Sequence, residues 1–161
     1  EMLERGSGHI VNTASFAGLY PYATVRLPYV AAKAGLIALT ESLAIHCEPK
    51  GVRVSAFCPG PVATGIAEKM RSFGEDVEFR GPGSEYDLLT AAEAATVLAD
   101  GMDAGRIVIP SDEKAWVPVA EHGADPDAFI RAKIDQFAAG DLGSPQIGPD
   151  LMERMQAMPK P

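Results

Sequence analysis

The sequence is poor in cysteine, in aromatic residues and in positive charge. Its 161 residues include two cysteines and one tryptophan, and 14 Lys plus Arg stand against 22 Asp plus Glu. Two cysteines do not make a disulfide framework or a metal site, so we expect a protein of the reducing cytoplasm. The formal net charge of −8 opposes contact with phosphate backbones, and we therefore expect no nucleic-acid partner.

Long uninterrupted apolar runs are also missing. No run approaches the roughly 18 residues of a membrane-spanning helix, and no basic segment followed by an apolar core opens the chain. We therefore expect no secretory signal and no membrane partner. Apolar residues still make up 47% of the chain and charged residues 22%, which is typical of a globular protein with a hydrophobic core.

Short apolar segments alternate with helical patterns along the chain. We predict strands at residues 9–15, 52–58 and 106–110, separated by helices at residues 28–48 and 91–102. Strand–helix–strand repeats with right-handed crossovers give a parallel sheet with helices against it. The sequence therefore predicts an α/β fold.

The two ends of the chain carry further helix signals. Residues 1–4 have the pattern of a last helical turn with Gly6 as its stop, and the first residue is Glu rather than Met. We expect from this that the chain is the C-terminal part of a longer domain. Asp125 before Pro126 predicts a helix start, so we divide the chain into a core at 1–115 and a helical tail at 116–161.

Three features of the sequence fall at the predicted ends of strands or at the start of the long helix. Ser15 ends the first strand, Tyr29 and Lys33 lie four residues apart at the start of the long helix, and Pro-Gly-Pro-Val-Ala-Thr at 59–64 follows the second strand. Ligands of open α/β sheets bind beyond these strand ends. The spacing places Lys33 on the Tyr29 face of the helix, where its ammonium favours the phenolate that an acid/base catalyst needs.

This ordered set resembles the short-chain dehydrogenase/reductase family. The matching segments are G-H-I-V-N-T-A-S-F-A-G at 8–18, Y-V-A-A-K-A-G at 29–35, and V-R-V with P-G-P-V-A-T within 52–64. A Tyr-x-x-x-Lys pair alone is common in helices. A serine fourteen residues before the tyrosine and P-G-x-V-x-T after the next strand make the set specific. The match is dense over residues 6–66 and looser over 90–110.

The resemblance implies the C-terminal portion of a doubly wound, Rossmann-like domain that uses NAD or NADP. Its implied activity is interconversion of a secondary alcohol and a ketone by hydride transfer. Tyr29 is then the acid/base, Lys33 binds the nicotinamide ribose, and Ser15 orients the substrate oxygen. Further contacts to the cofactor are implied for the loop residues Pro59, Gly60, Val62 and Thr64. A homodimer or homotetramer through the long helix is implied as well.

The chain also departs from the family pattern. Its 161 residues lack the glycine-rich phosphate loop, the N-A-G segment and a further catalytic asparagine, and a tail replaces the V-D-G-G ending after residue 109. The determinant of NAD against NADP would lie upstream of Glu1. Two alternatives therefore stay open: an epimerase or dehydratase that uses the same three residues, and an inactive fragment or binding module.

The sequence indicates only the chemical class of the substrate. Residues 62–89 mix apolar side chains into a loop-rich segment, namely Met70, Phe73, Phe79, Tyr86, Leu88 and Leu89. We expect from these a small alcohol or ketone of apolar character. A short terminal helix is predicted from Leu151 to Met158.

Overall fold

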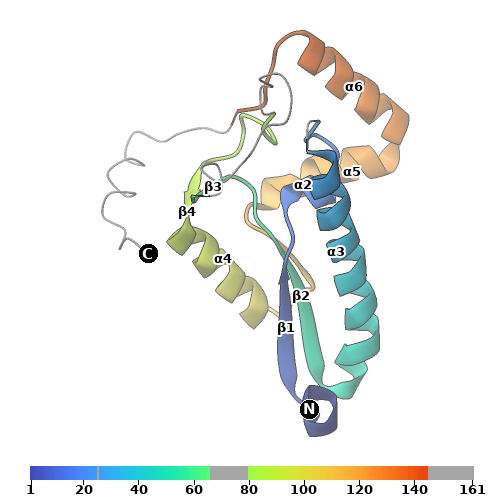
Figure 1. Ribbon diagram of the computed structural model, residues 1–161, viewed down its shortest axis with the longest axis vertical. Helices are drawn as coiled ribbons and strands as arrows, with labels where there is room; N and C mark the ends of the chain where they lie inside the picture. The colour runs from blue at the N-terminus through green and yellow to red at the C-terminus, as the bar shows by residue number, and fades with distance from the viewer. Residues whose placement is uncertain (25, 66–79, 145–161) are drawn as a thin grey trace.

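The computed structural model describes residues 1–24, 26–65 and 80–144. Three parallel strands form its central sheet in the order β1–β2–β5 (Figure 1), with bounds Gly8–Thr13, Val52–Cys58 and Val108–Pro110. All six residues of β1 pair with β2, whereas β5 pairs only with the last residues of β2. The predicted parallel sheet is confirmed. The predicted terminal helix and much of the 62–89 segment lie outside the described residues.

Two crossover helices cover the opposite faces of β2. α3 (Leu27–Cys47) packs its Ala44 against Val52 and Val54, and α4 (Ala91–Asp103) packs beside Phe57. Alternate residues of a strand point to opposite faces, so a strand buried on both faces reads as a near-continuous apolar run. Both helices begin at the end of the sheet where β1 and β2 finish, as the ribbon in Figure 1 shows.

Local signals set the helix ends. Leu27 and Pro28 open α3, and Gly51 follows it in the left-handed conformation at φ 80°. Thr90 caps α4 through the predicted capping box, in which its hydroxyl accepts from the Glu93 amide at 3.2 Å. The expected helix boundaries are therefore confirmed to within a residue.

α3 is long and apolar enough on average to resemble a membrane-spanning helix, although polar residues interrupt its apolar runs. By length and composition alone, residues 27–50 could cross a membrane, with a mean hydropathy of 1.3. The helix nevertheless buries Ile37, Thr40, Ala44 and Cys47 on the sheet side. It is therefore the crossover layer of an α/β domain.

Several short elements escaped the sequence prediction. Residues 16–27, expected to form a loop, contain the helix α2 at Phe16–Leu19. Val62–Ala63 and Leu89–Thr90 pair as the short parallel strands β3 and β4. The helical turn at the start of the chain, by contrast, was predicted: α1 spans Met2–Arg5 and ends at Gly6.

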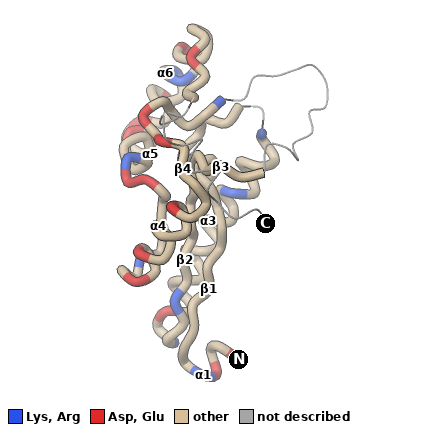
Figure 2. The backbone as a smooth tube through the Cα atoms, turned by 90° about the vertical axis from the view of Figure 1, so that its left-hand side faces the viewer, with Lys and Arg blue, Asp and Glu red and all other residues tan. Residues whose placement is uncertain are grey.

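The tail begins with α5 (Trp116–Ala124), which was not predicted, and continues with α6 (Pro126–Ala138), which was. Asp125 caps α6 by accepting from the Ala128 amide at 2.9 Å. Phe129 of α6 joins the same buried cluster as Phe16 and Tyr86. The boundary placed at residue 115 stays a prediction. Figure 2 shows the positions of Asp and Glu along the helices and at their ends, with few charged residues on β1 and β2.

Candidate active site

A cavity of about 460 Å³ opens where β1 and β2 end. Every site residue predicted from the sequence lines it: Ser15, Tyr29, Lys33, Pro59, Gly60, Val62 and Thr64. Its opposite wall was not anticipated and comes from one face of α4, with Ala91, Ala94, Ala95 and Leu98. The fold thus gathers residues from four separate segments around one space.

Ser15 lies at the junction of β1 and α2, and its orientation is fixed. Its backbone is extended, and its Oγ accepts a hydrogen bond of 3.2 Å from the Ala17 amide as the N-cap of α2. The neighbouring Phe16 amide donates to the Pro59 carbonyl at 2.9 Å. Because Oγ already accepts, the hydroxyl proton can be donated to an oxygen in the cavity.

Tyr29 and Lys33 share the first turns of α3. The Lys33 ammonium lies 5.7 Å from the centre of the Tyr29 ring and donates to the Thr13 carbonyl at 2.7 Å. The Arg26 guanidinium lies 6.0 Å from the same ring centre. Two positive charges therefore stand beside the Tyr29 ring.

A glycine allows α2 to lie directly on the backbone of α3. A Cβ at Gly18 would sit 2.6 Å from the carbonyl carbon of Lys33, a distance that real side chains do not tolerate. At Gly60 a Cβ would meet the Phe16 ring at 2.5 Å. Both glycines, which the family resemblance includes, thus set the distance between the wall segments of the cavity.

The loop after β2 is held from β5. The Gly60 amide donates to the Ser111 hydroxyl at 2.8 Å, and the Ser111 amide donates to the Cys58 carbonyl at 3.0 Å. Ser111 is buried, which makes it a positioning residue for residues 59–64. Sequence reasoning missed it, although a lone serine directly after the apolar R-I-V-I-P run was a usable signal.

Comparison with known proteins agrees with this geometry. Residues 1–74 match the family model for short chain dehydrogenase. The oxidoreductase UcpA of Escherichia coli (strain K12) is 32% identical over 129 residues, which cover 78% of this chain and 47% of the relative. The chain belongs to the short-chain dehydrogenase/reductase family. It spans about half the length of the curated relatives it matches.

Two further members of the family show how far the similarity extends. The 2-(S)-hydroxypropyl-CoM dehydrogenase 3 of Xanthobacter autotrophicus is 44% identical over 70 residues, 43% of this chain and 27% of the relative. The structure of a short-chain dehydrogenase from Sphingobium yanoikuyae in complex with NADPH superposes with a TM-score of 0.59 at 25% identity. That match covers 79% of this chain and 46% of the other. Its parallel sheet with flanking helices has the Rossmann-like topology of the family.

Within this short-chain dehydrogenase/reductase fold, Tyr22 is a second residue that the sequence did not reveal. It is buried in the cluster of side chains against which Tyr29 packs. Burial raises the pKa of Tyr22 to about 12, so the phenol stays neutral. No sequence pattern marks it, because its place depends on the path of the chain between α2 and α3.

Three buried aromatic rings pack together, namely those of Phe16, Tyr20 and Tyr86, and Phe16 directly follows Ser15. The Tyr20 hydroxyl donates to the Tyr86 hydroxyl at 3.3 Å, and the Phe16 and Tyr86 rings meet edge to face at 5.2 Å. Burial raises the pKa of both Tyr20 and Tyr86. These tyrosines lie outside the cavity lining, so Tyr29 is the phenol that faces the cavity.

Proposed function

We propose that the protein containing this chain is an NAD- or NADP-dependent oxidoreductase that interconverts a secondary alcohol and a ketone. One observation carries the proposal: Ser15, Tyr29 and Lys33 line a single cavity together with the loop at residues 59–64. Family membership supports it, as does a structural neighbour solved with NADPH.

The residues of the cavity fit the nicotinamide end of such a cofactor. The volume of about 460 Å³ lies within the range of roughly 300–1,000 Å³ typical of small-molecule sites. Lys33 offers donors for ribose hydroxyls, Thr64 a hydroxyl for the carboxamide, and Val62 and Leu98 apolar walls for a ring. A bound dinucleotide supplies the hydride to the carbonyl carbon or accepts it from the alcohol.

The side chains of this chain handle the proton. In the direction of reduction, the carbonyl oxygen accepts hydrogen bonds from the Ser15 and Tyr29 hydroxyls. As the hydride arrives at carbon, Tyr29 transfers its proton to that oxygen and becomes a phenolate. The Lys33 ammonium then stabilises the phenolate charge, and its bond to the Thr13 carbonyl holds it in place. Oxidation of the alcohol runs through the same steps in reverse.

The proposal is tested with the intact protein, NADH or NADPH, and a panel of small ketones. The wild type should oxidise one reduced dinucleotide in a ketone-dependent way. Tyr29→Phe should lower kcat by about 10²–10⁴-fold without altering the circular dichroism spectrum, because it removes only the hydroxyl that transfers the proton. Tyr20→Phe, which removes a hydroxyl outside the cavity, is the matched control and should keep most of the activity. Retention of more than about a tenth of the rate in Tyr29→Phe would refute the role of Tyr29.

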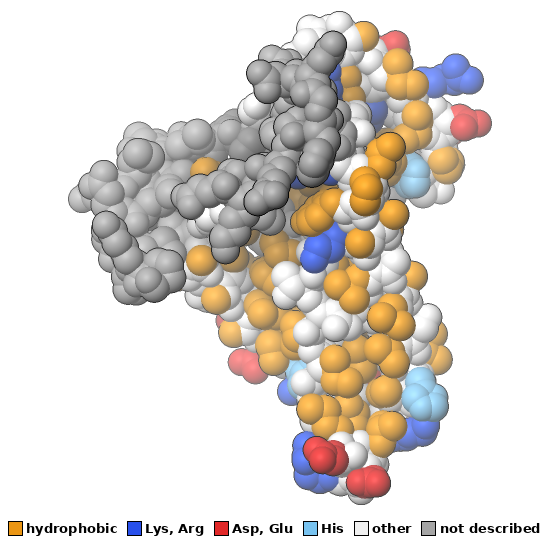
Figure 3. All heavy atoms as spheres, viewed as in Figure 1, with side chains coloured by type: hydrophobic (Ala, Val, Ile, Leu, Met, Phe, Trp, Pro, Cys, Tyr) orange, Lys and Arg blue, Asp and Glu red, His pale blue; other side chains and the backbone are white. Residues whose placement is uncertain are grey.

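We also propose that α3 mediates self-assembly into a homodimer or a larger homo-oligomer. Its outer face carries apolar side chains that no described residue covers, among them Leu39 and Ile45, the latter 80% exposed. Figure 3 shows hydrophobic side chains gathered on this side of the molecule. Ile45→Glu should shift the sedimentation coefficient of the intact protein toward that of a monomer. Val117→Glu, on the exposed face of α5, should not. A wild type that sediments as a monomer at micromolar concentration contradicts the proposal.

A further inference from the structure

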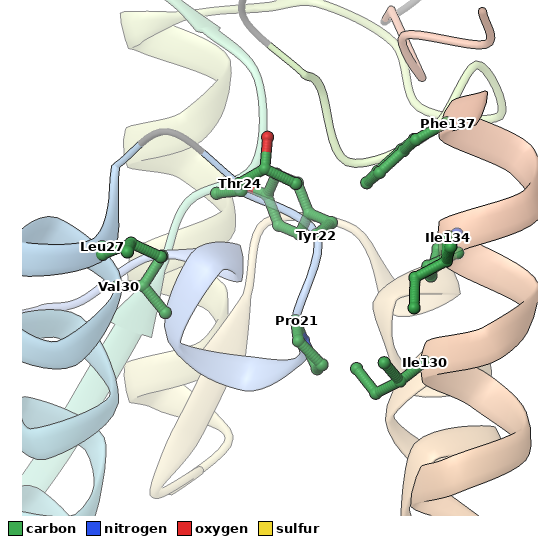
Figure 4. A pocket seen from close by; sticks show the side chains of 10 residues that line it. Pro21, Tyr22, Thr24, Leu27, Val30, Ile130, Ile134 and Phe137 are labelled. Carbon is green, nitrogen blue, oxygen red and sulfur yellow. The ribbon is translucent and has the colours of Figure 1, made fainter.

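A second cavity, of about 220 Å³, lies between the start of α3, the segment before it and the helix α6. Figure 4 shows side chains of α3 and α6 facing each other across it. Its lining is almost entirely apolar: Pro21, Tyr22, Ala23, Thr24, Leu27, Val30, Ile130, Lys133, Ile134 and Phe137. The Lys133 ammonium donates a hydrogen bond of 3.0 Å to the side-chain oxygen of Gln136, and the Lys133 methylenes form part of the cavity wall. The chemistry of this space therefore selects an apolar group.

The second cavity lies next to the candidate active site at the start of α3, where Val30 lines the second cavity and Tyr29 lines the first. Tyr22 lines the second cavity and belongs to the buried cluster against which Tyr29 packs. A ligand that extends past the start of α3 would occupy both cavities.

The walls on the α6 side are held in position. Arg80 donates to the carbonyl oxygens of Asp141 at 2.9 Å and Phe137 at 3.3 Å, and its guanidinium lies 4.3 Å from the centre of the Phe137 ring. Arg26 in turn donates to the Arg80 carbonyl at 2.9 Å. These bonds join the end of α6 to the segment before α3, so the cavity is formed before a ligand arrives.

The size of the cavity and its apolar surface indicate what fills it. At about 220 Å³ it falls below the roughly 300–1,000 Å³ of pockets that enclose whole ligands, so it suits part of a ligand. Ile134 is 60% exposed on α6, which leaves apolar area that a ligand would remove from water. We propose that this cavity binds an alkyl or aryl arm of the substrate whose reacting carbon lies in the catalytic cavity. The inference rests on the proposed function and adds the substrate class to it.

A series of methyl ketones with lengthening unbranched alkyl chains tests the inference in the intact protein. For the wild type, kcat/KM should rise by about three- to fourfold for each methylene buried, then level off once the cavity is full. Ile134→Trp should fill the space. It should lower kcat/KM for the longest chains at least tenfold and leave the shortest ketone unaffected. Ile134→Ala should extend the rise to longer or branched chains.

The matched control is Ala132→Trp, an exposed position on the same helix that does not line the cavity. It should reproduce the wild-type profile. Turnover of the shortest ketone with no effect of chain length, or with equal loss for all chains in Ile134→Trp, would overturn the inference while leaving the proposed function intact. A change of oligomeric state in Ile134→Trp at an unaltered chain-length profile would also overturn it, because the face would then contact a protein. Failure to reduce any ketone would instead refute the proposed function.

Discussion

The Lys33 ammonium donates a hydrogen bond of 2.7 Å to the carbonyl oxygen of Thr13, which joins the first turns of α3 to the end of β1. The same ammonium lies 5.7 Å from the centre of the Tyr29 ring. One cation thus ties a helix to a strand and places its charge beside the phenol. The spacing of Tyr29 and Lys33 on one helix face predicted their proximity, but the contact with Thr13 depends on the crossover that returns α3 to the sheet.

Replacing Lys33 should harm catalysis more than stability. Lys33→Met removes the charge and the donors but keeps much of the stem, so we expect kcat/KM to fall by at least tenfold in steady-state assays. The melting temperature should change little, because one net hydrogen bond contributes only about 0.5–1.5 kcal/mol. Lys33→Arg should restore less than half of the activity, since the planar guanidinium cannot reproduce the position of the ammonium. Full activity in Lys33→Met would contradict the assigned role.

Gly18 should not tolerate even alanine. Its Cβ would sit 2.6 Å from the Lys33 carbonyl carbon, so α2 would have to move away from α3 and take Ser15 with it. We expect Gly18→Ala to lower the free energy of unfolding by about 1–3 kcal/mol, the usual cost of overpacking. Gly123→Ala in α5 is the control, because a Cβ there meets no described atom within 4 Å. It should be neutral or stabilising by up to about 1 kcal/mol. Urea denaturation of both variants gives the comparison, and equal effects would refute the close packing.

Local signals explain how much of the fold the sequence predicts. β2 was predicted with its observed bounds, Val52–Cys58, because Gly51 and Pro59 bracket an apolar run. α4 followed from the T-x-x-E capping box. The α2 helix was missed because its four residues depend on the Ser15 cap and on packing against the backbone of α3.

The residues of the candidate site likewise fall into those that the sequence predicts and those that it does not. Ser15, Tyr29, Lys33 and the loop at 59–64 could be predicted because strand ends and helix starts meet at one edge of a parallel sheet. Tyr22 and Ser111 could not, because their contacts join segments whose approach only the folded chain determines. The apolar cavity beneath α6 was missed for the same reason, since Arg80 fixes that helix from a distant segment.

His9 should make the stability of the fold depend on pH. Ser55 donates to the Arg106 carbonyl at 2.6 Å, so the His9 Nε2 must donate to the Ser55 hydroxyl at 2.8 Å. The buried Nδ1 then meets no partner among the described residues. Burial, followed by the positive charge of Arg53, lowers the pKa of His9, against a smaller opposing effect of Glu48.

A lowered folded-state pKa means that the unfolded chain binds a proton more readily as the pH falls below about 6.5. The contribution of His9 to stability is therefore complete above that pH and is lost progressively below it. His9→Gln, which can still donate to Ser55, should show a weaker loss of stability between about pH 7 and pH 5 in urea denaturation. Identical pH profiles for wild type and variant would contradict a lowered pKa.

Transfer of deuteride most directly tests whether the cavity around Ser15, Tyr29 and Lys33 is the active site of a dehydrogenase. The intact protein is incubated with a small ketone and NADH or NADPH carrying deuterium at the reactive nicotinamide carbon, and the alcohol formed is examined by mass spectrometry and NMR. We predict deuterium at the carbinol carbon with at least one of the two dinucleotides, and loss of this product in Tyr29→Phe. Alcohol without deuterium at that carbon, or no alcohol with either dinucleotide, would contradict the proposed chemistry.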